Sequence, residues 1–158
     1  MSTGLLPRID TALFVGGPQL TTVSQDGRNF VLVNEKRLRA ELTDGTIIEL
    51  NMPIGGTSDG ASMPEFAAIL GFTPYGPWWG PAYAHDGCFQ NWIQKQVNGL
   101  WVPADFDEAT SNDLINALMF ASGVDDRFRV IIKKALDMFG WYAFHKDRQA
   151  SQNAHVFK

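Results

Sequence analysis

The 158-residue chain contains a single cysteine, Cys88, so no intrachain disulfide can form. We therefore expect a cytosolic fold, or one that needs no oxidising compartment. No apolar run approaches the roughly 20 residues of a membrane-spanning helix. The first residues also lack the basic region and the apolar stretch of a signal peptide. These absences predict a protein without a membrane span and without a secretory leader.

The chain also has fewer basic residues than acidic ones. The chain has 13 Lys and Arg residues against 17 Asp and Glu residues, which gives a formal net charge of −4. Because nucleic-acid binding depends on neutralising phosphates, we expect no nucleic-acid partner. The chain has 45% hydrophobic residues, and one of this length buries roughly 70% of its surface on folding. A single domain with a real core is therefore expected.

The pattern of the chain changes near Pro53. Residues 1–52 alternate apolar and polar positions between Gly-Gly-Pro and Asp-Gly turns, which predicts an antiparallel meander with one wet face. The expected strands cover residues 11–15, 20–23, 29–33, 38–42 and 46–50. We interpret Lys36, Arg37 and Arg39 as part of a solvated strand face, with an anion site as the alternative.

The second half of the chain is predicted to be helical. Residues 53–81 are rich in Gly, Pro and Ser and predict loops around a short helix at 64–70. Apolar residues at helical spacing then predict helices over 82–97, 107–121 and 125–147, with a kink at Gly140 and a polar tail at 149–158. The predicted fold is a single α+β domain over 1–148. In it an N-terminal antiparallel β-meander (1–52) packs with a C-terminal cluster of three to four helices (82–147).

The adjacent residues His85 and Asp86 are the first candidates for chemistry. The pKa of an unperturbed histidine lies near neutrality, so His85 could be a general base or a metal ligand. Asp86 could bind a hard cation, and calcium or magnesium is the cofactor option left open. The alternative makes His85 a satisfied histidine at a helix junction and Asp86 a charge that complements the helix dipole.

Asp59 and Asp113 are the candidate partners of His85. Asp59 lies in a Ser-Asp-Gly-Ala-Ser turn, where it forms an Asx-turn or aims its carboxylate at His85 or at a metal. Asp113 lies on the next predicted helix, where it is exposed or accepts the imidazole N–H of His85. Cys88 lies one turn from His85, and a buried, inert thiol is the favoured interpretation.

Aromatic residues gather in the loop before the His-Asp pair, among them Tyr75, Trp78 and Trp79. Such residues are usually core anchors. An exposed Trp78-Trp79 pair would instead mark a surface for a partner or a ligand. Zinc is weakly supported, because the chain has three histidines and no Cys-x-x-Cys or His-Glu-x-x-His motif.

Four elements occur in a fixed order: Asp-Gly-Ala-Ser-Met-Pro at 59–64, Ala-His-Asp at 84–86, Asp113, and Phe-Gly-Trp at 139–141. With them the chain resembles, over 53–141, the phage and prophage family called domain of unknown function 1353. The resemblance implies a phage-encoded protein, and that family has no firmly assigned reaction. The chain departs from the pattern at Gly87 and Cys88, where larger apolar residues are common, and in a longer segment at 94–107.

A weaker resemblance concerns only the helices. A Gly-rich loop, a His-Asp pair on a helix and an Asp on the following helix are similar to the arrangement in phospholipase A2 enzymes. The resemblance implies that His85 activates water, Asp86 holds calcium and Asp113 orients the imidazole. Those enzymes usually have disulfides, which this chain cannot form.

Two functions follow as expectations. The favoured one is a phage accessory or virion protein, associated with a tail or capsid, that binds other phage proteins or a host factor in the host cytoplasm or the virion. The alternative is a small hydrolase of a lipid ester or cell-wall bond. In it His85 is the general base, Asp113 orients the imidazole, and Asp59 and Asp86 are polar or metal ligands.

Overall fold

The structure is a computed structural model that describes residues 7–25, 27, 29–58 and 77–156. The expected helix at 64–70 lies outside these residues. The described elements are β1 (Ile9–Val15), β2 (Thr21–Val23), β3 (Phe30–Leu32), β4 (Lys36–Leu42), β5 (Ile47–Met52), β6 (Thr57–Ser58), α2 (Trp79–Phe89), β7 (Gln94–Val97), β8 (Leu100–Pro103), α3 (Glu108–Ala121) and α4 (Asp126–Val156).

The predicted α+β class is confirmed. The described strands form a five-stranded sheet, in the order β1-β4-β5-β7-β8, and a three-stranded sheet, in the order β2-β3-β6. Each described pair of strands is antiparallel. The N-terminal strands match the sequence prediction closely, but they divide between two sheets because β1 pairs with β4 and not with β2.

Alternation along β4 explains its placement. Leu38 and Ala40 point into the core and are fully buried, while Arg37 and Arg39 point to solvent. The prediction for Lys36 was wrong, because its side chain is buried. Its ammonium group donates to the carbonyl groups of Val15 and Gly17, and burial lowers its pKa.

The turn between β4 and β5 is the Asp-Gly turn that the sequence predicts. Gly45 has a φ of +86°, a conformation that costs glycine little and other residues more. Asp44 supports the turn, because its Oδ1 accepts from the backbone N–H of Thr46 at 2.9 Å. Local turn chemistry therefore sets the register of this pair.

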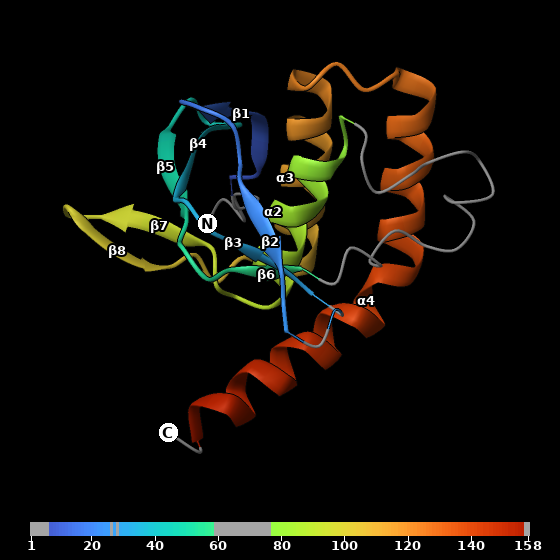
Figure 1. Ribbon diagram of the computed structural model, residues 1–158. Coiled ribbons are helices and arrows are strands. Elements are labelled where there is room, and N and C mark those ends of the chain that lie inside the picture. Colours follow the sequence, from blue (N-terminus) through green and yellow to red (C-terminus); the bar gives the residue numbers. More distant parts are fainter. Residues whose placement is uncertain (1–6, 26, 28, 59–76, 157–158) are drawn as a thin grey trace, which may run out of the picture.

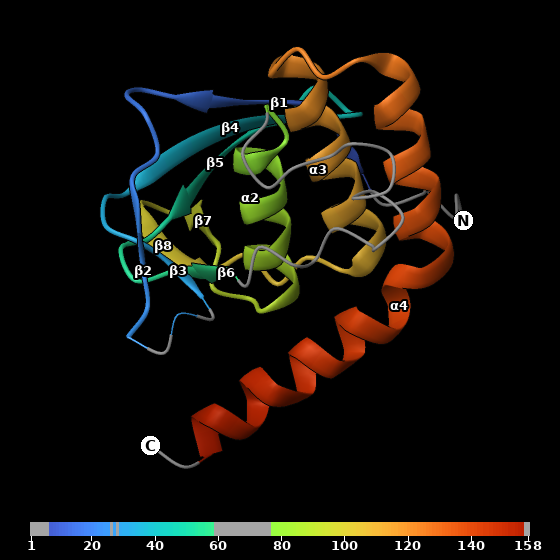
Figure 2. The same ribbon diagram turned by 45° about the vertical axis from the view of Figure 1, so that its right-hand side comes forward.

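The helices form layers on one side of the strands. Figures 1 and 2 show α2 and α3 side by side between the strands and the first part of α4. The main hydrophobic core lies between the strands and α2 with α3, and includes Leu38, Leu50, Tyr83 and Leu118. A second cluster around Ile115, Met119 and Ile132 joins α3 to α4. Among the described residues, no helix combines the length and apolar character needed to cross a membrane.

The predicted helix over 82–97 was wrong in its second half. α2 ends at Phe89, and the chain then forms the β7–β8 hairpin, which extends the five-stranded sheet. Asn98 and Gly99 connect the two strands with positive φ values of 51° and 79°. Asn-Gly is a strong signal for a two-residue hairpin turn. The segment therefore forms a hairpin, although its apolar residues are also spaced as in a helix.

The predicted helix end at 147 was also wrong, because α4 continues to Val156 and includes most of the segment predicted as a polar tail. Figure 1 shows that α4 changes direction part-way along its length. Arg148 ties the later part of α4 to the end of α2: its Nε donates to the carbonyl of Phe89 at 3.1 Å and its Nη2 to that of Cys88 at 3.0 Å. Helix C-termini leave such carbonyls without intrahelical partners, so Arg148 caps α2 from another helix.

The indole ring of Trp92 fills the space between α2 and β6. A Cβ atom added at Gly56 would lie 2.8 Å from this ring, and one added at Gly87 would lie 2.7 Å from it. The indole Nε1 donates to the carbonyl of Thr57 at 3.1 Å. Both glycines are therefore required by the close approach of the ring, which explains the small residue that follows the His-Asp pair.

We predict that Gly87→Ala destabilises the protein by about 1–3 kcal/mol, the usual cost of overpacking a filled core. Alanine favours a helix by about 1 kcal/mol over glycine, so the clash with Trp92 has to exceed that gain. Urea unfolding measures the difference. Gly17→Ala is the matched control, since a Cβ there meets nothing within 4 Å. A Gly87→Ala protein more stable than the wild type would contradict the role of Trp92.

Candidate functional site

His85 and Asp86 lie in the middle of α2, between the strands and α3. Both are buried, each with 3% of its surface exposed. α2 is covered on all sides over its last seven residues, from Tyr83 to Phe89. Because successive residues of a helix point about 100° apart, the two side chains face different neighbours.

His85 faces α3. Its Nε2 lies 2.9 Å from Oδ1 of Asn112, and its ring packs against the Phe89 ring with centroids 4.1 Å apart. Burial lowers the pKa of His85 to about 4, although the bond to Asn112 acts in the opposite direction. The imidazole is therefore neutral at pH 7.

Hydrogen bonding assigns the imidazole tautomer. Nδ2 of Asn112 donates to Oδ1 of Asp137 at 3.0 Å, which leaves Oδ1 of Asn112 as an acceptor only. Nε2 of His85 therefore carries the proton and donates it to Asn112. The lone pair of the neutral ring then resides on Nδ1.

The same line of polar groups reaches the surface through α4. Nζ of Lys133 donates to Oδ2 of Asp137 at 2.7 Å. Glu108, at the start of α3, lies near the same carboxylate. Burial raises its pKa, and the charge of Asp137 adds to this effect. The hydrogen bonds thus lead from the buried imidazole of His85 through the neutral amide of Asn112 to the ion pair of Asp137 with Lys133. The charged groups of this line therefore lie near solvent.

Asp86 faces the small sheet. Its Oδ2 accepts a hydrogen bond from the hydroxyl of Ser58 in β6. On the preceding turn of α2, the hydroxyl of Tyr83 lies 2.6 Å from the carbonyl of Gly56 and 3.0 Å from that of Phe30. The hydrogen bonds of Asp86 and Tyr83 thus join α2 to β3, to β6 and to the residue before β6. Asp86 therefore contributes to the helix–sheet junction.

The structure does not bring Asp113 to His85. Asp113 binds Arg8 through both oxygens, at 2.6 Å from Nε and 2.7 Å from Nη2. The partner of the imidazole is the preceding residue, Asn112. One signal for Asn112 was present in the sequence: it shares a helical face with Ile115 and Met119, and a polar residue on such a face needs a hydrogen-bond partner.

The other candidate residues divide into two groups. Asp59 and Tyr75 lie outside the described residues, so their predicted roles stay predictions. Trp78 and Trp79 are half-buried: Trp78 packs on the α3–α4 cluster, and Trp79 meets the Phe30 ring edge-on with centroids 4.8 Å apart. Part of each indole is thus used in packing, and a partner surface there also stays a prediction.

Cys88 matches the inert thiol that the sequence predicts. It is fully buried, and burial raises its pKa to about 12. Across the ranges that the structure describes, no group of three or more His, Cys, Asp or Glu side chains is placed to hold a metal ion. A cation bound by Asp86 together with Asp59 would involve a residue outside those ranges.

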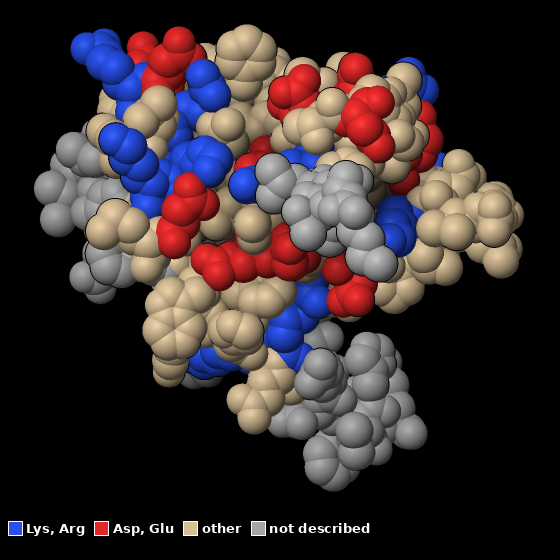
Figure 3. Space-filling model, turned by 180° about the vertical axis from the view of Figure 1, so that it is seen from behind, with Lys and Arg blue, Asp and Glu red and all other residues tan. Residues whose placement is uncertain are grey.

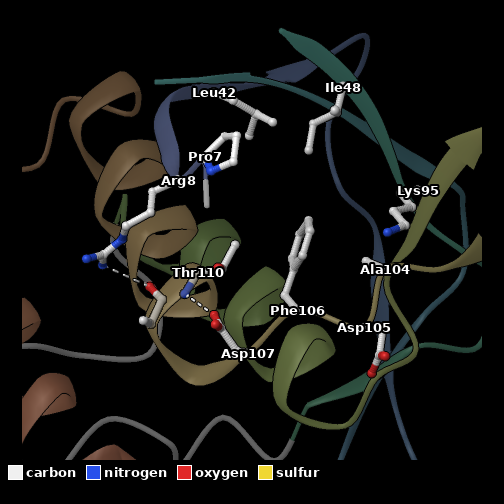
Figure 4. Close-up of a pocket in the computed structure, with 11 residues that line it drawn as sticks. Pro7, Arg8, Leu42, Ile48, Lys95, Ala104, Asp105, Phe106, Asp107 and Thr110 are labelled. Carbon is white, nitrogen blue, oxygen red and sulfur yellow. Dashed lines mark hydrogen bonds between the residues drawn. The ribbon is translucent and has the colours of Figure 1, made fainter. Parts of the chain in front are cut away.

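A separate hollow lies on the other side of α3, between the N-terminal end of that helix and the large sheet (Figure 4). It has a volume of about 570 Å³ and does not include His85 or Asp86 in its lining. Leu42 and Ile48 of the sheet and Phe106, just before α3, supply much of its apolar wall. This volume lies in the range of small-molecule sites.

No family model, no curated protein and no solved structure matches this chain. The resemblance to the phage family therefore remains a prediction from the motifs. The geometry of the described residues carries the functional argument.

We predict that His85 makes stability depend on pH. Its pKa is about 4 in the folded protein and 6.5 in an ordinary environment, so the unfolded chain binds the extra proton first as pH falls. The stabilisation is complete above pH 6.5 and is lost progressively towards pH 4, a loss of roughly 3 kcal/mol. Urea unfolding across this window measures the slope.

Two variants identify the source of the slope. His85→Gln keeps a side-chain N–H for Asn112 but cannot be protonated, so its curve should be flatter than that of the wild type. His145→Gln removes an exposed histidine on α4 and should leave the slope unchanged. If His145→Gln flattens the curve and His85→Gln does not, the assignment is wrong.

Proposed function

We propose that this chain is a non-catalytic interaction protein, a phage accessory or virion component as its motifs imply. The observation that carries the proposal is the use of the His-Asp pair in structure. Nε2 of His85 is bound to Asn112, Asp86 is bound to Ser58, and both residues are buried. A general base has to reach the proton that it abstracts, and such burial does not favour this.

The surface of α4 supports an interaction role. Met138, Trp141 and Tyr142 are exposed to 65%, 56% and 65%. Large apolar and aromatic side chains close together on one helix are typical of protein–protein interfaces. The partners that fit this proposal are other phage proteins or a host factor.

The charges of the surface fit a protein partner better than a nucleic acid. Figure 3 shows basic and acidic side chains mixed over one face of the molecule, with neither sign covering it. Nucleic-acid interfaces collect positive charge in one patch or stripe. This distribution agrees with the net charge of −4.

The first test separates the structural role of Asp86 from metal binding. After treatment with a chelator, the melting temperature of the wild type should not respond specifically to calcium, magnesium, manganese or zinc. Asp86→Asn should lower the melting temperature by roughly 5 °C with or without metal, since it weakens hydrogen bonds to a buried charge. Asp10→Asn, on an exposed position of β1, is the control.

A metal-specific rise in melting temperature that disappears in Asp86→Asn would contradict the proposal. It would favour the hydrolase with His85 as general base, and hydrolysis of ester and cell-wall substrates would then be measured on the wild type and on His85→Gln. Turnover by the wild type that His85→Gln abolishes, with folding retained, would establish that alternative.

The second test concerns α4. We expect the double variant Met138→Ser, Tyr142→Ser to unfold within about 0.5 kcal/mol of the wild type, because both side chains are exposed. Binding to the partner should weaken by roughly tenfold or more, as for loss of an interface hot spot. Capture from a lysate of phage-infected cells, quantified by mass spectrometry, measures this. Lys134→Ser on the same helix is the control, and equal capture by all three proteins would contradict the role of α4.

A further inference from the structure

The hollow beside α3 has the composition of a ligand site. Its wall includes the apolar side chains of Pro7, Leu42, Ile48, Ala104 and Phe106. In Figure 4 the Phe106 ring rises into the hollow towards Ile48, and Leu42 points in from the sheet. Leu42, Ile48 and Phe106 are only partly buried, so they form an outer layer of the core that a ligand can contact. An apolar wall with few polar groups is the usual character of a small-molecule pocket.

Most charged groups at its border are already paired. Arg8 is bound to Asp113, and Figure 4 shows its guanidinium group turned away from the hollow. Asp105 is 2.8 Å from Nη1 of Arg148. Asp107 caps α3, where Oδ1 accepts from the backbone N–H of Thr110 at 2.7 Å and the positive end of the helix offsets its charge.

Lys95 differs from these groups. It lies half-buried on β7 and lines the hollow, and Figure 4 shows its ammonium group directed into the space between Ile48 and Phe106. Among the described residues, no hydrogen-bond acceptor or carboxylate is paired with its Nζ. A cation at the edge of an apolar cavity attracts an anion and strengthens the hydrogen bonds made to it.

We propose that this hollow binds a small amphipathic carboxylate, a molecule with an aliphatic body and a single anionic head. The body lies against Leu42, Ile48 and Phe106, and the carboxylate accepts a hydrogen bond from Lys95. One ammonium group matches a singly charged head, whereas a phosphate carries more charge and needs several donors. This site is separate from the His-Asp pair and does not depend on the interaction role proposed for the chain.

Isothermal titration calorimetry with sodium dodecanoate, kept below its micelle concentration, tests the proposal on the full chain. The wild type should bind one dodecanoate per chain. Hexanoate, with the same head and a shorter body, should bind more weakly. Dodecyltrimethylammonium, with a similar body and the opposite charge, should bind more weakly as well.

Two substitutions of Lys95 locate the head group. Lys95→Gln should weaken dodecanoate binding roughly tenfold, in line with the loss of a hydrogen bond to a charged group. Lys95→Glu should remove dodecanoate binding and favour dodecyltrimethylammonium instead. Lys134→Gln, which removes an exposed lysine of α4, should bind dodecanoate as the wild type does. Urea unfolding verifies that the substituted proteins are folded.

Three results would overturn the proposal. One is a wild-type protein that shows no saturable binding of dodecanoate. Another is binding that neither substitution of Lys95 changes. The third is self-association of the chain through this wall, which sedimentation would show as a mass that rises with protein concentration and that Lys95→Glu abolishes. The occupant of the hollow would then be a second copy of the chain.

Discussion

The distance between α2 and β6 controls the arrangement of this molecule, and the Trp92 indole sets that distance. The ring lies against both backbones, at Gly56 on one side and Gly87 on the other, with no room for a side chain at either position. The indole Nε1 donates to the carbonyl of Thr57, and the hydroxyl of Tyr83 on α2 donates to the carbonyl of Gly56. With α2 held here, His85 faces α3 and Asp86 faces the small sheet. The placement of the whole polar site therefore follows from a packing constraint.

The polar groups then set how the helices fit together. His85 on α2, Asn112 on α3 and Asp137 on α4 form one line in which each member can take only one role. Asp137 accepts, so Asn112 donates to it through its amide nitrogen and accepts through its oxygen, and the imidazole has to donate. A shift of any helix along its neighbour would leave a buried polar group without a partner, which is costly. The line thus favours one register of the three helices.

The two sides of α3 differ in what they offer to other molecules. On the α2 side, polar groups are buried and bound to one another. On the side of the large sheet, a hollow of about 570 Å³ has an apolar wall and the Lys95 ammonium group at its edge. Binding needs groups that are not already satisfied within the fold, and this hollow and the exposed side chains of α4 provide them. His85 and Asp86 are therefore bound to partners within the fold, and the accessible apolar surfaces of the described residues lie elsewhere.

Local patterns in the sequence predicted much of the fold. Alternation and turn residues located β1 to β5, and the apolar spacing located α3. The sequence also singled out His85 and Asp86. It missed Asn112, the burial of Lys36, the β7–β8 hairpin and the full length of α4. Strand alternation and turns depend on neighbours in the chain, so local sequence patterns are enough to predict them. The partner of His85 and the surroundings of Lys36 depend on which faces of distant elements meet, and no local pattern encodes that.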